Sequence, residues 1–215
     1  MTYFKGSLKL QETTSQINRE ILLALLPQVE AYFKNTFNKV SSQIQNLIID
    51  SIKNAPEYDA LLNGQLKAEF GLSDSDARVN SILEFWRNIQ VSYYPVKIKN
   101  NSILSANFII NMIKSDFSDV LSLGASTFIT EKGSELNWLE WLLLFGNKTI
   151  IKDYEVVLGP NPRSRTGLAI MKGVISGKWS VPSEFTGTIN NNWITRSIDS
   201  VDDKINKLLL DSLRI

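Results

Sequence analysis

Two groups of acidic residues have spacings that could bind a metal or catalyse acid–base chemistry. Asp199, Asp202 and Asp203 lie three and four positions apart in a stretch of helical periodicity, a spacing that lets carboxylates share a divalent cation. The same spacing is typical of the solvated outer face of an amphipathic helix, opposite its apolar stripe. We therefore expect a charged helix face and no metal site.

The second group is Glu135 and Glu140, which flank Trp138 and Trp141. A carboxylate pair beside aromatic rings resembles the arrangement that cleaves sugars. Five positions apart on a helix, however, the two acids do not share one face. The polar face of an amphipathic helix explains the two acids better, so we predict no catalytic residues here.

The segment GPNPRSRTG, residues 159–167, places Arg163 and Arg165 in a turn-rich loop. Glycines and arginines together suggest phosphate binding, but the loop lacks the lysine and the spacing of a phosphate loop and precedes no convincing helix. Two interpretations remain open. The loop is a basic surface that contacts a partner or a nucleic-acid backbone, or it is an ordinary surface loop.

Large apolar side chains recur in GKWSVPSEFTGTINNNWIT, residues 177–195, on a backbone rich in turn-forming residues. The segment is the wall of a pocket, a plug over the protein's own core, or a surface that is buried only against another chain. Tryptophan is seldom fully buried in monomers and is enriched at interfaces. The candidate residues for a subunit or partner interface are Arg163, Arg165, Trp179, Phe185 and Trp193.

Composition excludes several classes of function. The 215 residues include no cysteine and no histidine, which rules out disulfides, thiol nucleophiles, imidazole triads and the usual zinc and iron sites. We expect no cofactor. With 23 basic and 22 acidic residues the net charge is +1, so no global field attracts nucleic acid or an anionic membrane.

The first residues, MTYFKGSLKLQETTSQ, lack the pattern of a signal peptide, and we expect no export. The longest apolar runs, such as WLEWLLLF, are far too short to span a bilayer.

The elements that must position these side chains follow from periodicity. Apolar residues three or four apart predict a long amino-terminal helix over 16–54, which Pro27 either kinks or divides, and a shorter helical piece that Gly64 interrupts. A helix after SDSD should bury Val79, Ile82 and Trp86. Further helices are predicted over 134–146 and 192–213.

Alternation and branched residues predict strands over 89–98, 102–113, 127–133, 149–159 and 168–171. Pro95 favours an edge position. The expected fold is α+β, with a long amino-terminal helix and a carboxyl-terminal helix packed on a mainly antiparallel sheet. We expect one domain, with a helical arm over 1–56, a core of helix and sheet over 57–191, and a final helix over 192–215.

Several segments together resemble the neck and tail-completion proteins of tailed bacteriophages. They are EYDALLNGQLKAEFG after the long helix, WLEWLLLFGNKTIIKDYEVVLG, SRTGLAIM and WSVPSEFTGT. The resemblance extends from about residue 54 to 198 and is most specific over 164–171 and 179–188. Near Gly64 the chain departs from the usual basic or small residues and has Asn63, Gln65 and Lys67.

The resemblance implies a structural virion protein without catalytic residues, assembled in the cytoplasm of the bacterial host. It would form a homo-oligomeric ring between a portal or adaptor protein on the head side and a tail terminator or tail tube protein on the tail side. Non-specific contact with genomic DNA in the channel is a further expectation, and no membrane partner is expected.

Two alternatives from other classes stay open. One is a small hydrolase that depends on carboxylates. The other is a weak nucleic-acid-binding module that uses Arg163, Arg165, Tyr93 and Tyr94, although the near-zero net charge disfavours strong binding.

Overall fold

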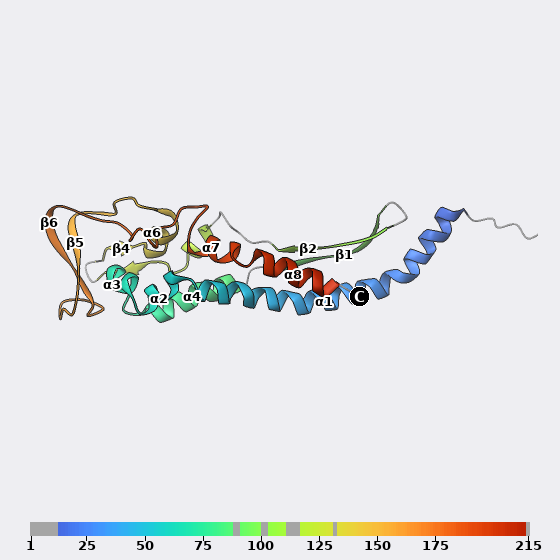
Figure 1. Cartoon of the computed structure of the whole chain (residues 1–215), viewed down its shortest axis with the longest axis horizontal. Coiled ribbons are helices and arrows are strands. Elements are labelled where there is room, and N and C mark those ends of the chain that lie inside the picture. Colours follow the sequence, from blue (N-terminus) through green and yellow to red (C-terminus); the bar gives the residue numbers. More distant parts are fainter. Residues whose placement is uncertain (1–12, 88–90, 100–102, 111–116, 131–132, 214–215) are drawn as a thin grey trace, which may run out of the picture. The chain divides into compact units, whose positions relative to one another are not determined.

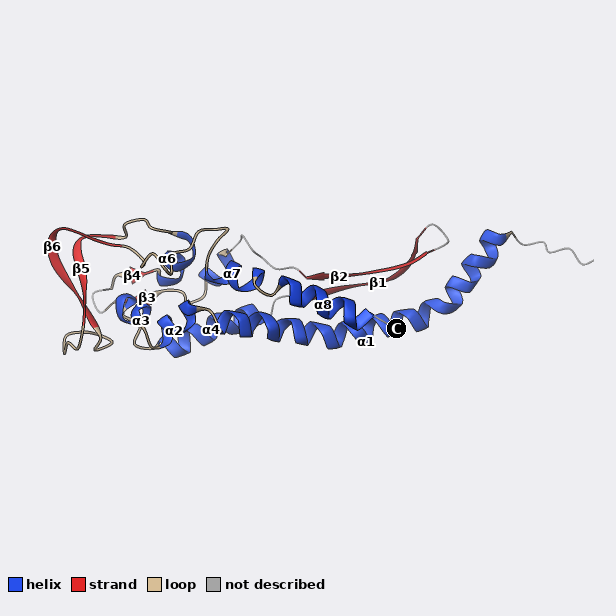
Figure 2. Cartoon of the chain, viewed as in Figure 1, coloured by secondary structure: helices blue, strands red, loops and turns tan. Residues whose placement is uncertain are grey.

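The computed structural model describes residues 13–87, 91–99, 103–110, 117–130 and 133–213. The fold is α+β, as predicted, with a long amino-terminal helix, a carboxyl-terminal helix and antiparallel strands (Figures 1 and 2). Helix α1 (Thr14–Lys53) runs continuously through Pro27, in agreement with the long apolar period.

The chain divides into two compact units, whose limits differ from the predicted segments. The first unit contains residues 1–41 and 91–111, and the second contains 42–90 and 112–215. Helix α1 therefore contributes to both units, whereas a separate helical arm over 1–56 was expected. The difference arises because the pair of strands over 91–110 contacts the first part of α1 rather than the rest of the predicted core.

The first unit consists of the beginning of α1 and a hairpin of β1 (Val91–Lys99) and β2 (Ile103–Ile110). The register of the ladder shifts between Tyr94 and Lys97, at Pro95. A carboxylate oxygen of Glu30, on α1, accepts hydrogen bonds from the Tyr93 hydroxyl at 2.8 Å and from the Val96 backbone amide at 2.7 Å. Proline thus lies at an irregularity, and the carboxylate binds a strand amide beside it.

The second unit is built around short helices. These are α2 (Pro56–Leu62), α3 (Gln65–Phe70), α4 (Ser75–Arg87), α5 (Ser118–Leu121) and α6 (Trp138–Leu144). Gly64 is the N-cap of α3 and separates it from α2, as predicted. The predicted inner face of α4 is buried, including Val79, Ile82 and Trp86.

The helix predicted over 134–146 begins later than expected. Residues Glu135–Leu136 form strand β4, which pairs with β3 (Phe128–Ile129). The turn is closed by the Thr130 amide, which donates to the Ser134 carbonyl at 2.8 Å. The residues that the local pattern assigns to the first turn of the helix are therefore part of β4, because they pair with β3. Helix α6 consequently begins at Trp138.

The helix predicted over 192–213 is two helices, α7 (Trp193–Asp199) and α8 (Asp202–Leu213). At the break, the Ser51 hydroxyl donates to the Ser197 carbonyl at 2.7 Å and lies 2.8 Å from the Ser200 hydroxyl. Side-chain hydroxyls that bind helix carbonyls compete with continuation of the helix. The two aspartates that follow lie in the first turn of α8, where the helix dipole favours negative charge.

The strands do not form one sheet. Within the described residues they make three separate antiparallel ladders, β1–β2, β3–β4 and β5 (Ile151–Leu158) with β6 (Ala169–Trp179). Strand β6 is much longer than the predicted 168–171 and includes the start of the turn-rich segment. The helices of the second unit consequently form a core with each other, and the β5–β6 hairpin extends from it beside α3 (Figure 1).

Candidate functional site

The turn-rich segment that follows β6 closes over the core of its own unit. Val181 and Phe185 are buried, and the Gly146 amide donates to the Gly187 carbonyl at 2.7 Å. A Cβ on Gly187 would lie 2.5 Å from the Leu142 carbonyl oxygen, so no larger residue fits against α6. Of the three interpretations of residues 177–195, the plug over the protein's own core describes residues 180–192.

Asn192 and Trp193 connect this segment to α7. The Asn192 side chain accepts from the amides of Ile194 and Thr195 at 3.0 and 3.1 Å, and the Thr195 hydroxyl accepts from the Asn192 amide at 2.7 Å. This reciprocal capping box satisfies amides that the helix leaves unpaired. The Trp193 indole donates to the Ile52 carbonyl of α1 at 3.1 Å.

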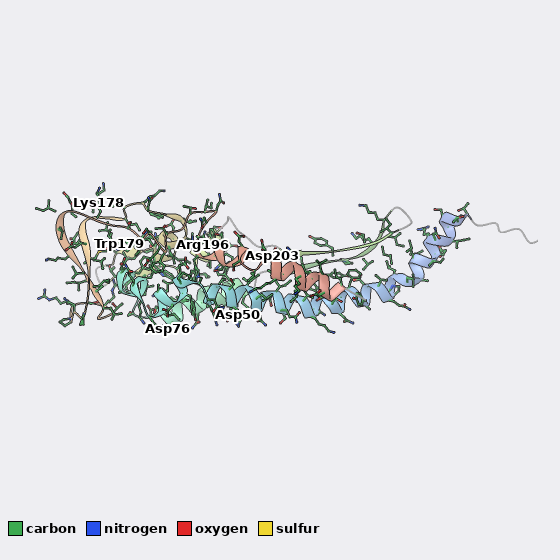
Figure 3. All side chains as sticks on the ribbon, in the orientation of Figure 1. Asp50, Asp76, Lys178, Trp179, Arg196 and Asp203 are labelled. Carbon is green, nitrogen blue, oxygen red and sulfur yellow. The ribbon has the colours of Figure 1, made fainter. Side chains whose placement is uncertain are left out.

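An ion pair joins α7 to α2. Arg196 is labelled in Figure 3. It donates to the buried carboxylate of Glu57 and, at 2.8 Å, to the Asn191 side-chain oxygen. Phe185 and Trp193 therefore belong to the core, and Trp193 is fully buried within its own chain. Their expected place at a subunit interface is corrected, because helices α1, α2 and α6 already cover this segment.

The base of the β5–β6 hairpin is an aromatic cluster formed by Phe70, Trp141 and Trp179. The ring centroids of Trp179 lie 5.9 Å from those of both Phe70 and Trp141, in edge-on geometry. The Trp179 indole donates to a carboxylate oxygen of Glu69 at 2.8 Å. Edge-on pairs and a satisfied indole fix ring orientation, so the cluster holds the hairpin on α3 and α6.

A cleft of about 740 Å³ opens between the hairpin and this cluster, and Arg163, Arg165 and Trp179 all line it. The structure thus brings together three of the five predicted interface residues. Trp179 is buried within its own chain, however, at 6% exposed, so its expected place at a subunit interface is corrected like that of Phe185 and Trp193. Other apolar lining residues come from the hairpin itself, including Tyr154, Val156 and Met171.

Arg165 stacks on the ring of Phe128, in β3. Its guanidinium lies 4.1 Å from the centroid of the Phe128 ring, and the Arg78 guanidinium lies 5.2 Å from the same centroid. Arg78 also binds Asp74, with 2.8 Å between nitrogen and oxygen. That hydrogen bond, together with the charges of Arg78 and Arg165, holds the pKa of Asp74 below its ordinary value, so a negative charge persists beside the two guanidinium groups.

The described residues that line the cleft do not include the pair of carboxylates that the hydrolase alternative uses. Among its described lining residues Glu69 is the one carboxylate, and its two oxygens accept from Gln65 and Trp179. Glu135 and Glu140 lie on different elements, β4 and α6. No group of three acidic residues in the described part of the chain is placed to hold a metal ion, the three aspartates of α7 and α8 included.

The residues proposed for nucleic-acid binding fall on separate units. Arg163 and Arg165 belong to the second unit, whereas Tyr93 and Tyr94 belong to the first, where Tyr93 is hydrogen bonded to Glu30. None of the described helices is long and apolar enough to cross a membrane.

Sequence reasoning missed the most exposed apolar residue of the hairpin, Ile175, which is 96% exposed. It lies in β6 within GVISG, residues 173–177. Glycines in a strand indicate a bulge or a close backbone approach, and that signal was present in the sequence. The predicted strand ends at residue 171, so these glycines lie inside a strand only in the folded structure.

Comparison with known protein families, with curated proteins and with solved structures finds no match for this chain.

Proposed function

We propose that this chain is a structural virion protein of a bacteriophage neck, a subunit of a ring that joins the portal end of the capsid to the tail. Its partners would be a portal or adaptor protein on one side and a tail terminator or tail tube protein on the other. The proposal begins from the resemblance over residues 164–171 and 179–188. In the fold these residues form the turn and first part of β6, its anchor Trp179, and the segment that closes the core.

The apolar surface of the β5–β6 hairpin supports an assembly role most directly. Six large apolar residues of the hairpin are exposed: Tyr154, Val157, Leu158, Leu168, Met171 and Ile175. Several exposed large apolar side chains on one element of a folded protein are typical of surfaces that bind other proteins. A ring subunit requires such a surface, because the contact between copies is buried only on assembly.

The anchoring of the hairpin supports the same role. A two-stranded hairpin is marginally stable by itself in water. Here its base is fixed by the contacts of Trp179 with Phe70, Trp141 and Glu69. A binding element that is ordered before association loses less conformational entropy when it binds. Arg163 and Arg165, at the turn end, would supply the non-specific contact with DNA.

The proposal is tested by measuring the mass of the purified protein in solution across a wide range of concentrations and imaging any large species by electron microscopy. We expect closed rings of one size. Asp202→Asn, a change of similar size in the first turn of α8, is the matched control and should assemble like the wild type. Open aggregates without a defined size, or a protein that neither assembles nor binds isolated phage necks, would contradict the proposal.

A further inference from the structure

The β5–β6 hairpin contains a large bulge. Between the partner pairs Lys152 with Lys178 and Tyr154 with Gly173, strand β5 has only Asp153, whereas β6 has residues 174–177. Asp153 and Ser176 have φ values of 62° and 63°, in the left-handed region that side chains other than glycine rarely adopt. A Cβ on Gly177 would lie 2.8 Å from the Tyr154 carbonyl oxygen, so the bulge depends on glycine there.

This bulge presents an apolar side chain to solvent. Ile175 lies within it and is 96% exposed. A strained backbone persists only where other interactions outweigh its cost, and such strain concentrates at binding sites. Within its own chain the bulge buries almost nothing of Ile175. The compensating burial is therefore expected on association with another molecule.

Each strand of the hairpin also has an outer edge for strand pairing. The Gly159 amide donates to the Leu168 carbonyl at 2.7 Å, which identifies these opposite residues as a hydrogen-bonded pair. Because such pairs alternate along an antiparallel ladder, the backbone groups of Val156 and Met171 point outward. Outward backbone groups on an edge are the template for adding a strand from another chain.

The charges on the two edges identify the kind of strand that fits. The charged residues of β6 are Lys172 and Lys178, both exposed. Those of β5 are Lys152, Asp153 and Glu155, also exposed, with a net charge of −1. Within one hairpin Lys172 faces Glu155 and Lys152 faces Lys178. Pairing β6 with a second β6 would bring like charges together, whereas pairing β6 with β5 of another copy brings strands of opposite net charge together.

We infer that the β6 edge of one copy binds the β5 edge of the next copy, with Ile175 as the apolar anchor of the contact. The two surfaces differ, so the contact is head-to-tail and repeats around a closed ring. This inference rests on the proposed function, since it names the contact by which the ring forms.

An exchange of charges tests the direction of pairing. One variant carries Lys172→Gln and Lys178→Glu, which makes β6 acidic, and the other carries Asp153→Asn and Glu155→Gln, which leaves Lys152 as the one charged residue of β5. Neither variant places like charges on the partners Glu155 and Lys172 within its own hairpin. Each variant alone opposes like charges at every junction, so its assembly should need at least about tenfold higher concentration, a factor that corresponds to about 1.4 kcal/mol. In an equimolar mixture every junction between the two different variants opposes unlike charges, so the mixture should assemble at a concentration closer to that of the wild type than either variant alone.

A second comparison tests the anchor. Ile175→Asp should prevent assembly, whereas Leu210→Asp, at a residue that is 63% exposed on α8, should leave assembly unchanged. Both variants should keep the wild-type circular dichroism spectrum and unfolding temperature, because neither side chain is buried. Equal effects of the two changes would overturn the role of Ile175.

The outcomes separate this inference from the proposed function. Wild-type rings together with unimpaired assembly of the charge variants and of Ile175→Asp would overturn the head-to-tail contact and leave the ring intact. A mixture that assembles no better than its two components would also overturn it. A wild-type protein that forms no rings and binds no phage necks would contradict both proposals.

Discussion

Gly187 shows how one residue decides whether the segment after β6 can close over the core. Its φ is not in the left-handed region, so its need for glycine is one of space. The site is bounded by the Leu142 carbonyl oxygen and the Asn192 Cβ, 2.5 and 2.6 Å from the position of an added Cβ. Both belong to elements that are fixed by their own hydrogen bonds, which leaves little room for adjustment.

We expect Gly187→Ala to lower the free energy of unfolding by about 1–3 kcal/mol, the usual cost of overpacking a filled site. Urea denaturation monitored by tryptophan fluorescence measures it. Gly124→Ala is the matched control, because an added Cβ at Gly124 meets nothing within 4 Å. Equal free energies of unfolding for the two variants would contradict the prediction, since they would show that the backbone around Gly187 can move to accept a Cβ.

The irregularity in β1 shows how an element is joined to its neighbour through one carboxylate. Pro95 has no amide hydrogen, and the shift in register beside it turns the Val96 amide toward Glu30. Burial raises the pKa of Tyr93 to about 12, with a further contribution from the hydrogen bond to Glu30. The neutral phenol is thus the form that the folded protein favours.

Titration of Tyr93 by NMR should therefore give a pKa of about 12, and Glu30→Gln should lower the value toward 10 without reaching it, since burial remains. The contribution to stability is fully present below pH 10, the model value for the unfolded chain, and is lost as pH rises toward about 12. Tyr93→Phe identifies the resonance. A Tyr93 pKa that Glu30→Gln leaves unchanged would contradict the assigned hydrogen bond.

For the whole molecule, the division into two units makes a prediction about independence. The core of the second unit is built from residues within 42–90 and 112–215. Val91 and Ile110 are partners in the β1–β2 ladder, so the ends of this hairpin lie about 5 Å apart and a short linker can bridge them.

Replacing residues 91–111 with a short Gly-Ser linker should leave the second unit folded. Calorimetry should show one cooperative transition within a few degrees of the corresponding wild-type transition, and the buried tryptophans should keep their blue-shifted fluorescence. Loss of cooperative unfolding would show that the second unit depends on the hairpin.

Local pattern was sufficient for most of the elements. The period of apolar residues predicted α1 and the inner face of α4, and branched residues predicted the two strands that pair as β1 and β2. Gly64 and Gly146 end or separate helices where the sequence indicated. These features depend on side chains within a few positions of each other along the chain, and for that reason they can be read from the sequence.

The errors occurred where distant residues decide the outcome. The start of α6 is set by the pairing of β4 with β3, and at the break between α7 and α8 the Ser197 carbonyl accepts from the distant Ser51 of α1 as well as from Ser200. No local period contains that information.

The candidate site has the same mixed origin. The sequence indicated Arg163 and Arg165, which are exposed, because arginines are typical of interfaces, and it indicated Trp179, which the fold buries. Which aromatic side chains remain accessible was decided by the fold. Trp193 is covered because its indole binds the Ile52 carbonyl, 141 positions away, whereas Ile175 is exposed because a bulge turns it outward. Burial results from contacts between distant segments, and these exist only once the chain has folded.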